Sequence, residues 1–90
     1  MKTYLLSYAN SLGTREEIKA AFITMGGVKS WRFDMSNAFY IRSEKNAYEL
    51  AKILRLARGD KGRFILTELV DGKFSGWLPP DTWKFIKEKK

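Results

Sequence analysis

The residue types that most enzymes use for acid–base, nucleophilic or zinc chemistry are scarce in this sequence. It holds no His and no Cys, so the commonest general base, the commonest zinc ligand and the thiolate nucleophile are missing. No serine therefore has a histidine to activate it. The carboxylates show no spacing typical of a catalytic pair or a calcium loop; they include Glu16, Glu17, Asp34, Asp60, Glu68 and Asp71. We predict no catalytic residue, no metal site and no cofactor.

Positive charge is the chemistry that the sequence does offer. Seventeen Lys and Arg residues stand against ten Asp and Glu residues, which gives a net charge of +7. Such a surface attracts polyanions in a salt-dependent way, so RNA or DNA is the first partner to consider. Part of the excess lies near the C-terminus, where Lys84, Lys87, Lys89 and Lys90 could serve only to keep the protein in solution.

Six basic side chains are candidates for binding nucleic acid. Four of them cluster around the predicted turn after the second helix, where arginine could grip phosphate with two parallel hydrogen bonds. Cations at a helix C-terminus also commonly do no more than complement the helix dipole. The other two lie on a predicted central hairpin, among aromatic residues that could stack on bases. Trp31 could instead pack under a helix or across a dimer. In chain order the six are Arg32, Arg42, Arg55, Arg58, Lys61 and Arg63.

Two of the three tryptophans lie close together near the C-terminus, outside the expected sheet. An apolar segment of this kind is ordered only when it is buried, either on its own sheet or against a second subunit. A candidate dimer or partner interface therefore comprises Trp77, Leu78, Pro79 and Trp83. Packing within one chain stays an equal alternative.

Strand-forming runs and helical stripes alternate along the 90 residues in the order β-α-β-β-α-β-α. The strand runs cover residues 2–8, 28–33, 38–42 and 63–70. We predict a single α+β domain over residues 1–90, a ferredoxin-like β-α-β-β-α-β sandwich with a short, basic C-terminal helix and tail over 80–90. Both long helices should cover one face of an antiparallel sheet and leave the other face partly exposed.

Individual residues predict where the helices begin and end. Thr14 and Glu17 have the spacing of a capping box, and the glycine pair at 26–27 should end the first helix. Ser43 is the expected cap of the second helix, which should end before residue 59. Pro80 suits the first turn of the last helix.

The motifs together resemble those of small CRISPR-associated adaptor and nuclease proteins and of their relatives, the virulence-associated protein D toxins and the SinR-like proteins. The matching stretches are YLLSY at 4–8, SNAFYI at 36–41, FILTEL at 64–69, and SGWLP at 75–79 followed by Trp83. The Gly-Trp-Leu-Pro segment with its trailing Trp is most similar to the SinR-like branch. The resemblance implies the ferredoxin-like fold and a homodimer, with the fourth strand or the segment after it forming the contact.

In active members of this family, a carboxylate directly after the Tyr of the first strand is taken to hold a divalent metal for phosphodiester cleavage. A hard oxygen ligand suits Mg²⁺ in that role. Here Tyr8 is followed by Ala9, which cannot ligate a metal, and Asn10 lacks the charge to replace the carboxylate. The family's cleavage chemistry therefore cannot be carried over to this chain.

We accordingly expect a catalytically silent, dimeric protein that binds nucleic acid or belongs to a nucleic-acid-handling system. Two rivals stay open: a protein-interaction module such as a phage or plasmid inhibitor, and a toxin-like, metal-dependent endoribonuclease that uses a carboxylate such as Asp34 or Glu68. No stretch approaches the ~20 apolar residues of a membrane span. With no cysteines, a cytoplasmic protein without a membrane partner is expected.

Overall fold

The computed structural model describes residues 1–88, so Lys89 and Lys90 of the predicted basic tail lie outside the described residues. Over this range the chain forms a four-stranded antiparallel sheet, three α-helices and one short 3-10 helix. In chain order the elements are β1 (Lys2–Tyr8), η1 (Asn10–Leu12), α1 (Arg15–Thr24), β2 (Ser30–Arg32), β3 (Ala38–Ser43), α2 (Ala47–Arg58), β4 (Phe64–Glu68) and α3 (Pro80–Lys87). The predicted α+β class and the order of strands and α-helices are confirmed.

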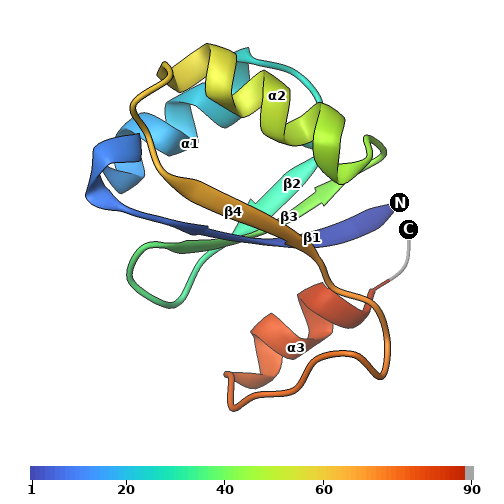
Figure 1. Ribbon diagram of the computed structural model, residues 1–90. Coiled ribbons are helices and arrows are strands. Elements are labelled where there is room, and N and C mark those ends of the chain that lie inside the picture. The colour runs from blue at the N-terminus through green and yellow to red at the C-terminus, as the bar shows by residue number, and fades with distance from the viewer. Residues whose placement is uncertain (89–90) are drawn as a thin grey trace.

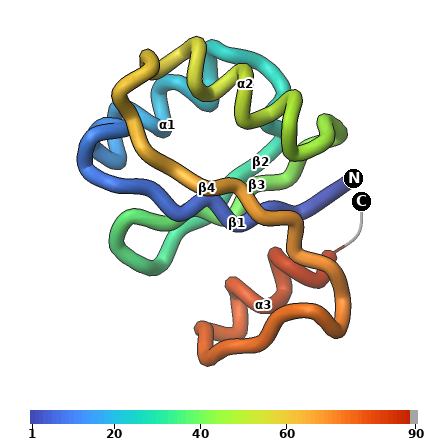
Figure 2. The backbone as a smooth tube through the Cα atoms, viewed as in Figure 1, coloured from blue at the N-terminus to red at the C-terminus, as the bar shows by residue number. Residues whose placement is uncertain are grey.

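The strands lie in the order β2-β3-β1-β4, and every neighbouring pair is antiparallel. β1 occupies the interior of the sheet, where Tyr4 lies opposite Ile41 of β3 on one side and Glu68 of β4 on the other. Figure 1 shows α1 and α2 together over one face of the sheet and α3 under the opposite face. The tube view in Figure 2 follows the long connection that carries the chain from β4 around the sheet to α3.

The hydrophobic core lies between the sheet and the α1–α2 layer. Alternate residues of β1 and β3 face these helices, and each fully buried aliphatic or aromatic side chain contributes roughly 1.5–3 kcal/mol. The buried core residues are Tyr4, Leu6 and Tyr8 of β1, Leu12, Ile18 and Phe22 of the η1–α1 region, Phe39 and Ile41 of β3, and Leu50 and Leu54 of α2. Trp31 of β2 packs against Phe22 of α1, with ring centroids 5.6 Å apart, so packing under a helix is what this tryptophan does.

The second face of the sheet is covered in part. Arg32, Tyr40 and Arg42 face α3, because they alternate with the core residues of β2 and β3. α3 does not cover β4, where Ile65 remains 65% exposed. The sequence predicted a partly exposed second face and left open whether the C-terminal segment packs on its own sheet or on a second subunit; α3 packs on its own sheet.

The cap predicted for α1 is found in the structure, whereas the cap predicted for α2 is not. The capping box at α1 is confirmed: Thr14 Oγ1 accepts from the Glu17 amide at 3.2 Å, and Glu17 Oε1 accepts from the Thr14 amide at 2.8 Å. The prediction that Ser43 caps the second helix is wrong. Ser43 ends β3 and is buried, with its hydroxyl donating to the Gly27 carbonyl and accepting from the Lys45 amide. Asn46 caps α2 instead, in a second capping box with Glu49.

The last helix begins at Pro80, as predicted, and its buried residues are Thr82 and Ile86. β2 and β4 are shorter than the strand-forming runs that predicted them: β2 pairs with β3 only over Ser30–Arg32, and β4 pairs with β1 only over Phe64–Glu68. Among the described residues, no helix combines the length and apolar character needed to cross a bilayer.

Candidate nucleic-acid interface

The six basic residues singled out in the sequence do not form one site. Arg55 and Arg58 lie in the last turns of α2, and Lys61 and Arg63 lie in the loop that leads to β4. Arg32 and Arg42 lie on the opposite face of the sheet, where they contact α3. The structure thus separates the candidates into a group of four and a group of two.

Arg32 and Arg42 hold α3 against the sheet. Arg32 Nε donates to the hydroxyl of Thr82 at 2.9 Å. Arg42 Nη2 donates to the main-chain carbonyl of Phe85 at 2.8 Å, and its guanidinium lies 3.9 Å from the centroid of the Phe85 ring. Nη2 also lies 3.8 Å from Glu88 Oε2. Both arginines therefore direct their donors toward their own chain.

A polar network joins the β2–β3 turn to α3 beside these arginines. Thr82 donates its hydroxyl proton to one carboxylate oxygen of Asp34, and Tyr40 donates to the other at 3.3 Å. Burial, and then the adjacent Asp34 carboxylate, raise the pKa of Tyr40 to about 12. The network keeps the phenol protonated and fixes the position of α3.

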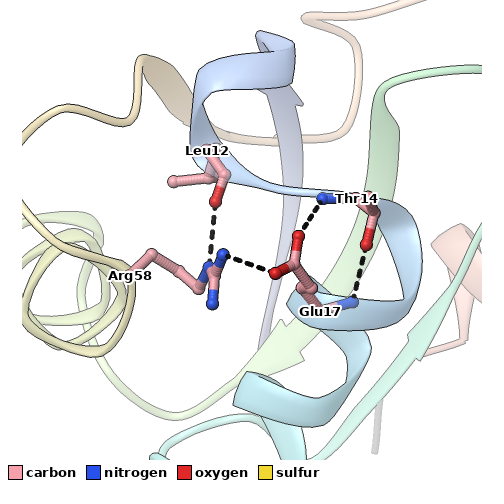
Figure 3. A network of polar contacts seen from close by, with 4 residues as sticks. All are labelled: Leu12, Thr14, Glu17 and Arg58. Atoms are coloured by element: carbon pink, nitrogen blue, oxygen red, sulfur yellow. Dashed lines mark hydrogen bonds and ion pairs between the residues drawn. The ribbon is translucent and has the colours of Figure 1, made fainter.

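Arg58 connects the end of α2 to the start of α1. Its Nε donates to the carbonyl of Leu12 at 2.9 Å, and Nη2 lies 3.6 Å from Glu17 Oε2 (Figure 3). Hydrogen bonds from Thr14, and then the Arg58 charge, hold the pKa of the Glu17 carboxyl below its ordinary value of 4.5. Arg58 thus extends the α1 capping box into a four-residue network, and its guanidinium is only partly available to an external anion.

Of the remaining cations, Arg55 lines a groove between α2 and β4. This groove, here called the α2–β4 groove, has a volume of about 180 Å³ and is lined by Tyr48, Ala51, Lys52, Arg55 and Phe64. Lys61 and Arg63 follow in the loop next to it, and both side chains are exposed. Arg55 Nε lies 3.9 Å from Asp60 Oδ1 in an exposed pair that contributes little.

Sequence reasoning missed Tyr48 and Lys52. Both lie on the solvent face of α2, where Tyr48, Lys52 and Arg55 recur at the helical spacing of four and three residues. Tyr48 is 78% exposed, which is unusual for a large aromatic ring. The spacing of these three residues is visible in the sequence. It does not form an apolar stripe, because this helix face combines one aromatic residue with cations.

The candidate interface residues near the C-terminus behave differently from one another. Trp83 is half-buried and stacks on Phe74, with ring centroids 6.3 Å apart. Leu78 is half-buried, Pro79 is exposed, and Trp77 is 99% exposed. Trp77 and Leu78 lie at a cavity of about 220 Å³ that Leu5, Met35, Leu69, Phe74 and Ile86 also line. Trp83 therefore packs within its own chain, whereas Trp77 does not.

The carboxylates show no cluster that could hold a metal within residues 1–88, where no three His, Cys, Asp or Glu side chains come together. Asp34 is engaged by Tyr40 and Thr82, and Glu68 lies on β4 opposite Tyr4. Ala9 donates its amide to the Arg63 carbonyl at 2.9 Å.

No protein-family model, curated protein or solved structure matches this chain.

Proposed function

We propose that this protein binds nucleic acid, without cleaving it, through the exposed cations that extend from α2 to the start of β4. This basic surface comprises Lys52, Arg55, Lys61 and Arg63. The observation that carries the proposal is that Lys52, Lys61 and Arg63 form no ion pair within residues 1–88, and that Arg55 has only the exposed contact with Asp60. Clustered cations without internal partners attract a phosphate backbone and release its counterions.

Arg32, Arg42 and Arg58 are weaker candidates for the same role. Each already donates to an oxygen of its own chain, at distances of 2.9, 2.8 and 2.9 Å. A phosphate would have to compete with these bonds, whereas at the basic surface it would displace water and, at most, the exposed Arg55–Asp60 contact.

The proposal includes a ferredoxin-like arrangement and membership of the SinR-like group. Two β-α-β units joined by the β2–β3 hairpin, with β1 and β3 inside the sheet and β2 and β4 at its edges, support the arrangement. The replacement of the family's carboxylate by Ala9 supports a binding protein rather than a nuclease. A cysteine-free protein of this kind suits the cytoplasm.

Self-association is the second part of the proposal, with a second copy of the chain covering Trp77. A tryptophan that is 99% exposed beside an apolar cavity is an anchor of the type that protein interfaces bury. β4 also lies at the edge of the sheet with Ile65 exposed, so one edge of its backbone is available for pairing. Sedimentation equilibrium should give a dimer for the wild type and a monomer for Trp77→Ala; a wild-type monomer at high concentration would remove this part of the proposal.

Fluorescence anisotropy with labelled RNA and DNA oligonucleotides at several salt concentrations tests the binding proposal. The triple variant Arg55→Ala/Lys61→Ala/Arg63→Ala should weaken binding and reduce the salt dependence by about one unit of slope per residue. Lys29→Ala/Lys73→Ala/Lys84→Ala removes the same net charge from other exposed positions and is the matched control. Equal losses in the two variants would mean that net charge, not this surface, attracts the nucleic acid.

The same samples distinguish the two rival functions. With Mg²⁺ present, intact strands on a denaturing gel are expected; cleavage that is lost in Asp34→Ala or Glu68→Ala would instead identify a ribonuclease. A protein that binds neither RNA nor DNA at physiological salt would favour the protein-interaction module, and its positive charge would then serve solubility.

A further inference from the structure

The α2–β4 groove is lined by both aromatic and cationic side chains. Tyr48 and Phe64 offer aromatic rings, and Lys52 and Arg55 bring charge to the same lining. The rings come from different elements, one from the first turns of α2 and the other from the start of β4. The groove is therefore part of the fold and not a feature of one helix.

Tyr48 is the ring that remains available to a ligand. It is 78% exposed, whereas Phe64 is half-buried and packs against the core. Tyr48, Lys52 and Arg55 occupy successive turns of one face of α2, and each turn advances by about 5.4 Å. A chain lying along this face would meet the aromatic ring first and then two cations, before it reached Lys61 and Arg63.

We infer that the α2–β4 groove receives an unpaired base of a single-stranded nucleic acid, stacked on Tyr48, while Lys52 and Arg55 contact the adjoining phosphates. This inference rests on the proposed nucleic-acid binding and names the form of the nucleic acid. Aromatic rings bind single strands because every base has a face on which to stack, whatever the sequence. A duplex keeps its bases paired and stacked inside and presents only phosphates and groove edges, so it could use the cations but not the ring.

Anisotropy measurements on four probes of one sequence distinguish the contribution of the Tyr48 ring to binding from that of the cations. The probes are single-stranded RNA, single-stranded DNA and the two corresponding duplexes, each at physiological salt. Wild-type protein should bind the single strands more tightly than the duplexes. Tyr48→Ala should weaken single-strand binding by about tenfold, the loss expected for one stacked base, and leave duplex binding unchanged.

Two control variants make the result specific to the ring. Tyr48→Phe keeps the stacking face and should retain the single-strand affinity. Leu56→Ala truncates another exposed side chain of α2, 70% exposed and outside the groove lining, and should have no effect. Unfolding curves of all variants establish that the helix is intact.

The outcomes distinguish a failure of this inference alone from a failure of the proposed function. Tyr48→Ala could weaken the binding of single strands and duplexes equally, or weaken the binding of neither. If, in either case, Arg55→Ala/Lys61→Ala/Arg63→Ala still weakens the binding of both, the inferred stacking on Tyr48 is wrong and the proposed basic surface stands. If the wild type binds no probe, both proposals fail together. A loss confined to RNA or to DNA single strands supports the inference and identifies the sugar that the groove accepts.

Discussion

Arg42 lies over the ring of Phe85, with its guanidinium carbon 3.9 Å from the ring centroid, and donates a hydrogen bond of 2.8 Å to the carbonyl of the same residue. One side chain of β3 therefore binds both the ring and the backbone of one residue in α3. The Nε of Arg42 is buried without a protein partner, so the site carries a desolvation cost that these contacts must offset. This relationship makes the attachment of α3 depend on few residues.

Replacing Arg42 should loosen α3. Arg42→Met keeps most of the apolar stem but removes the charged hydrogen bond and the cation–π contact, so we expect a loss of about 2 kcal/mol in the free energy of unfolding. Urea denaturation measures the loss. Arg55→Met, an exposed arginine on α2, is the control and should stay within about 0.5 kcal/mol of the wild type. A small effect of Arg42→Met would mean that α3 is held by its apolar contacts alone.

Alkaline conditions should destabilise the protein through Tyr40. Its folded pKa of about 12 lies above the ordinary value of 10.0, so its contribution is complete below pH 10 and is lost as pH rises toward 12. We expect the free energy of unfolding to fall by up to about 1.4 kcal/mol per pH unit in this window. Urea titrations from pH 8 to 11.5 should show a shallower decline for Tyr40→Phe, and parallel curves would contradict the assignment.

Acid should act through Glu17. Because its folded pKa is lowered from 4.5, the carboxylate stabilises the folded state fully above that value, and the contribution is lost as pH falls through the folded pKa. Glu17→Gln should therefore be less stable than the wild type near neutral pH, and the difference should shrink in acid. Thermal melts between pH 3 and 7 test this expectation. Glu16→Gln removes a neighbouring carboxylate outside the network and should not reproduce the pattern.

Gly62 should tolerate no side chain. A Cβ at this position would lie 2.8 Å from the Cα of Leu12, and that backbone cannot move without disturbing η1. We expect Gly62→Ala to lower the free energy of unfolding by about 1–3 kcal/mol. Gly76→Ala is the matched control, because nothing lies within 4 Å of its Cβ position. Equal stability of the two variants in chemical denaturation would show that the backbone of η1 can shift to accommodate the added Cβ at little cost in free energy.

The sequence predicted correctly those features that depend on residues close together in the chain. Thr14 and Glu17 satisfy each other within one turn, so their sequence spacing was sufficient. Ser43 does not cap α2 because it is the last residue of β3, and its hydroxyl accepts from the Lys45 amide while donating to the Gly27 carbonyl, a partner that only the folded chain brings near. The same limit applies to Arg32 and Arg42: alternation identifies the face of the sheet, but not the helix that returns to occupy it.

The candidate site, too, could be predicted only in part from the sequence. The charge excess and the cluster after the second helix were visible in composition and spacing. That Tyr48 and Phe64 line one groove was not visible, since the groove forms only when α2 packs beside β4, and nothing local relates these two residues.

The position of β1 inside the sheet governs the order in which the chain can fold during synthesis. β1 is the first strand to emerge from a ribosome, yet its partners β3 and β4 come much later in the chain. Until β4 is made, one edge of β1 has no backbone partner, and its apolar face waits for α2 to close the core. A pause in translation after β3 would therefore leave a nascent chain with an open strand edge, and chaperone binding is expected to be greatest at that length.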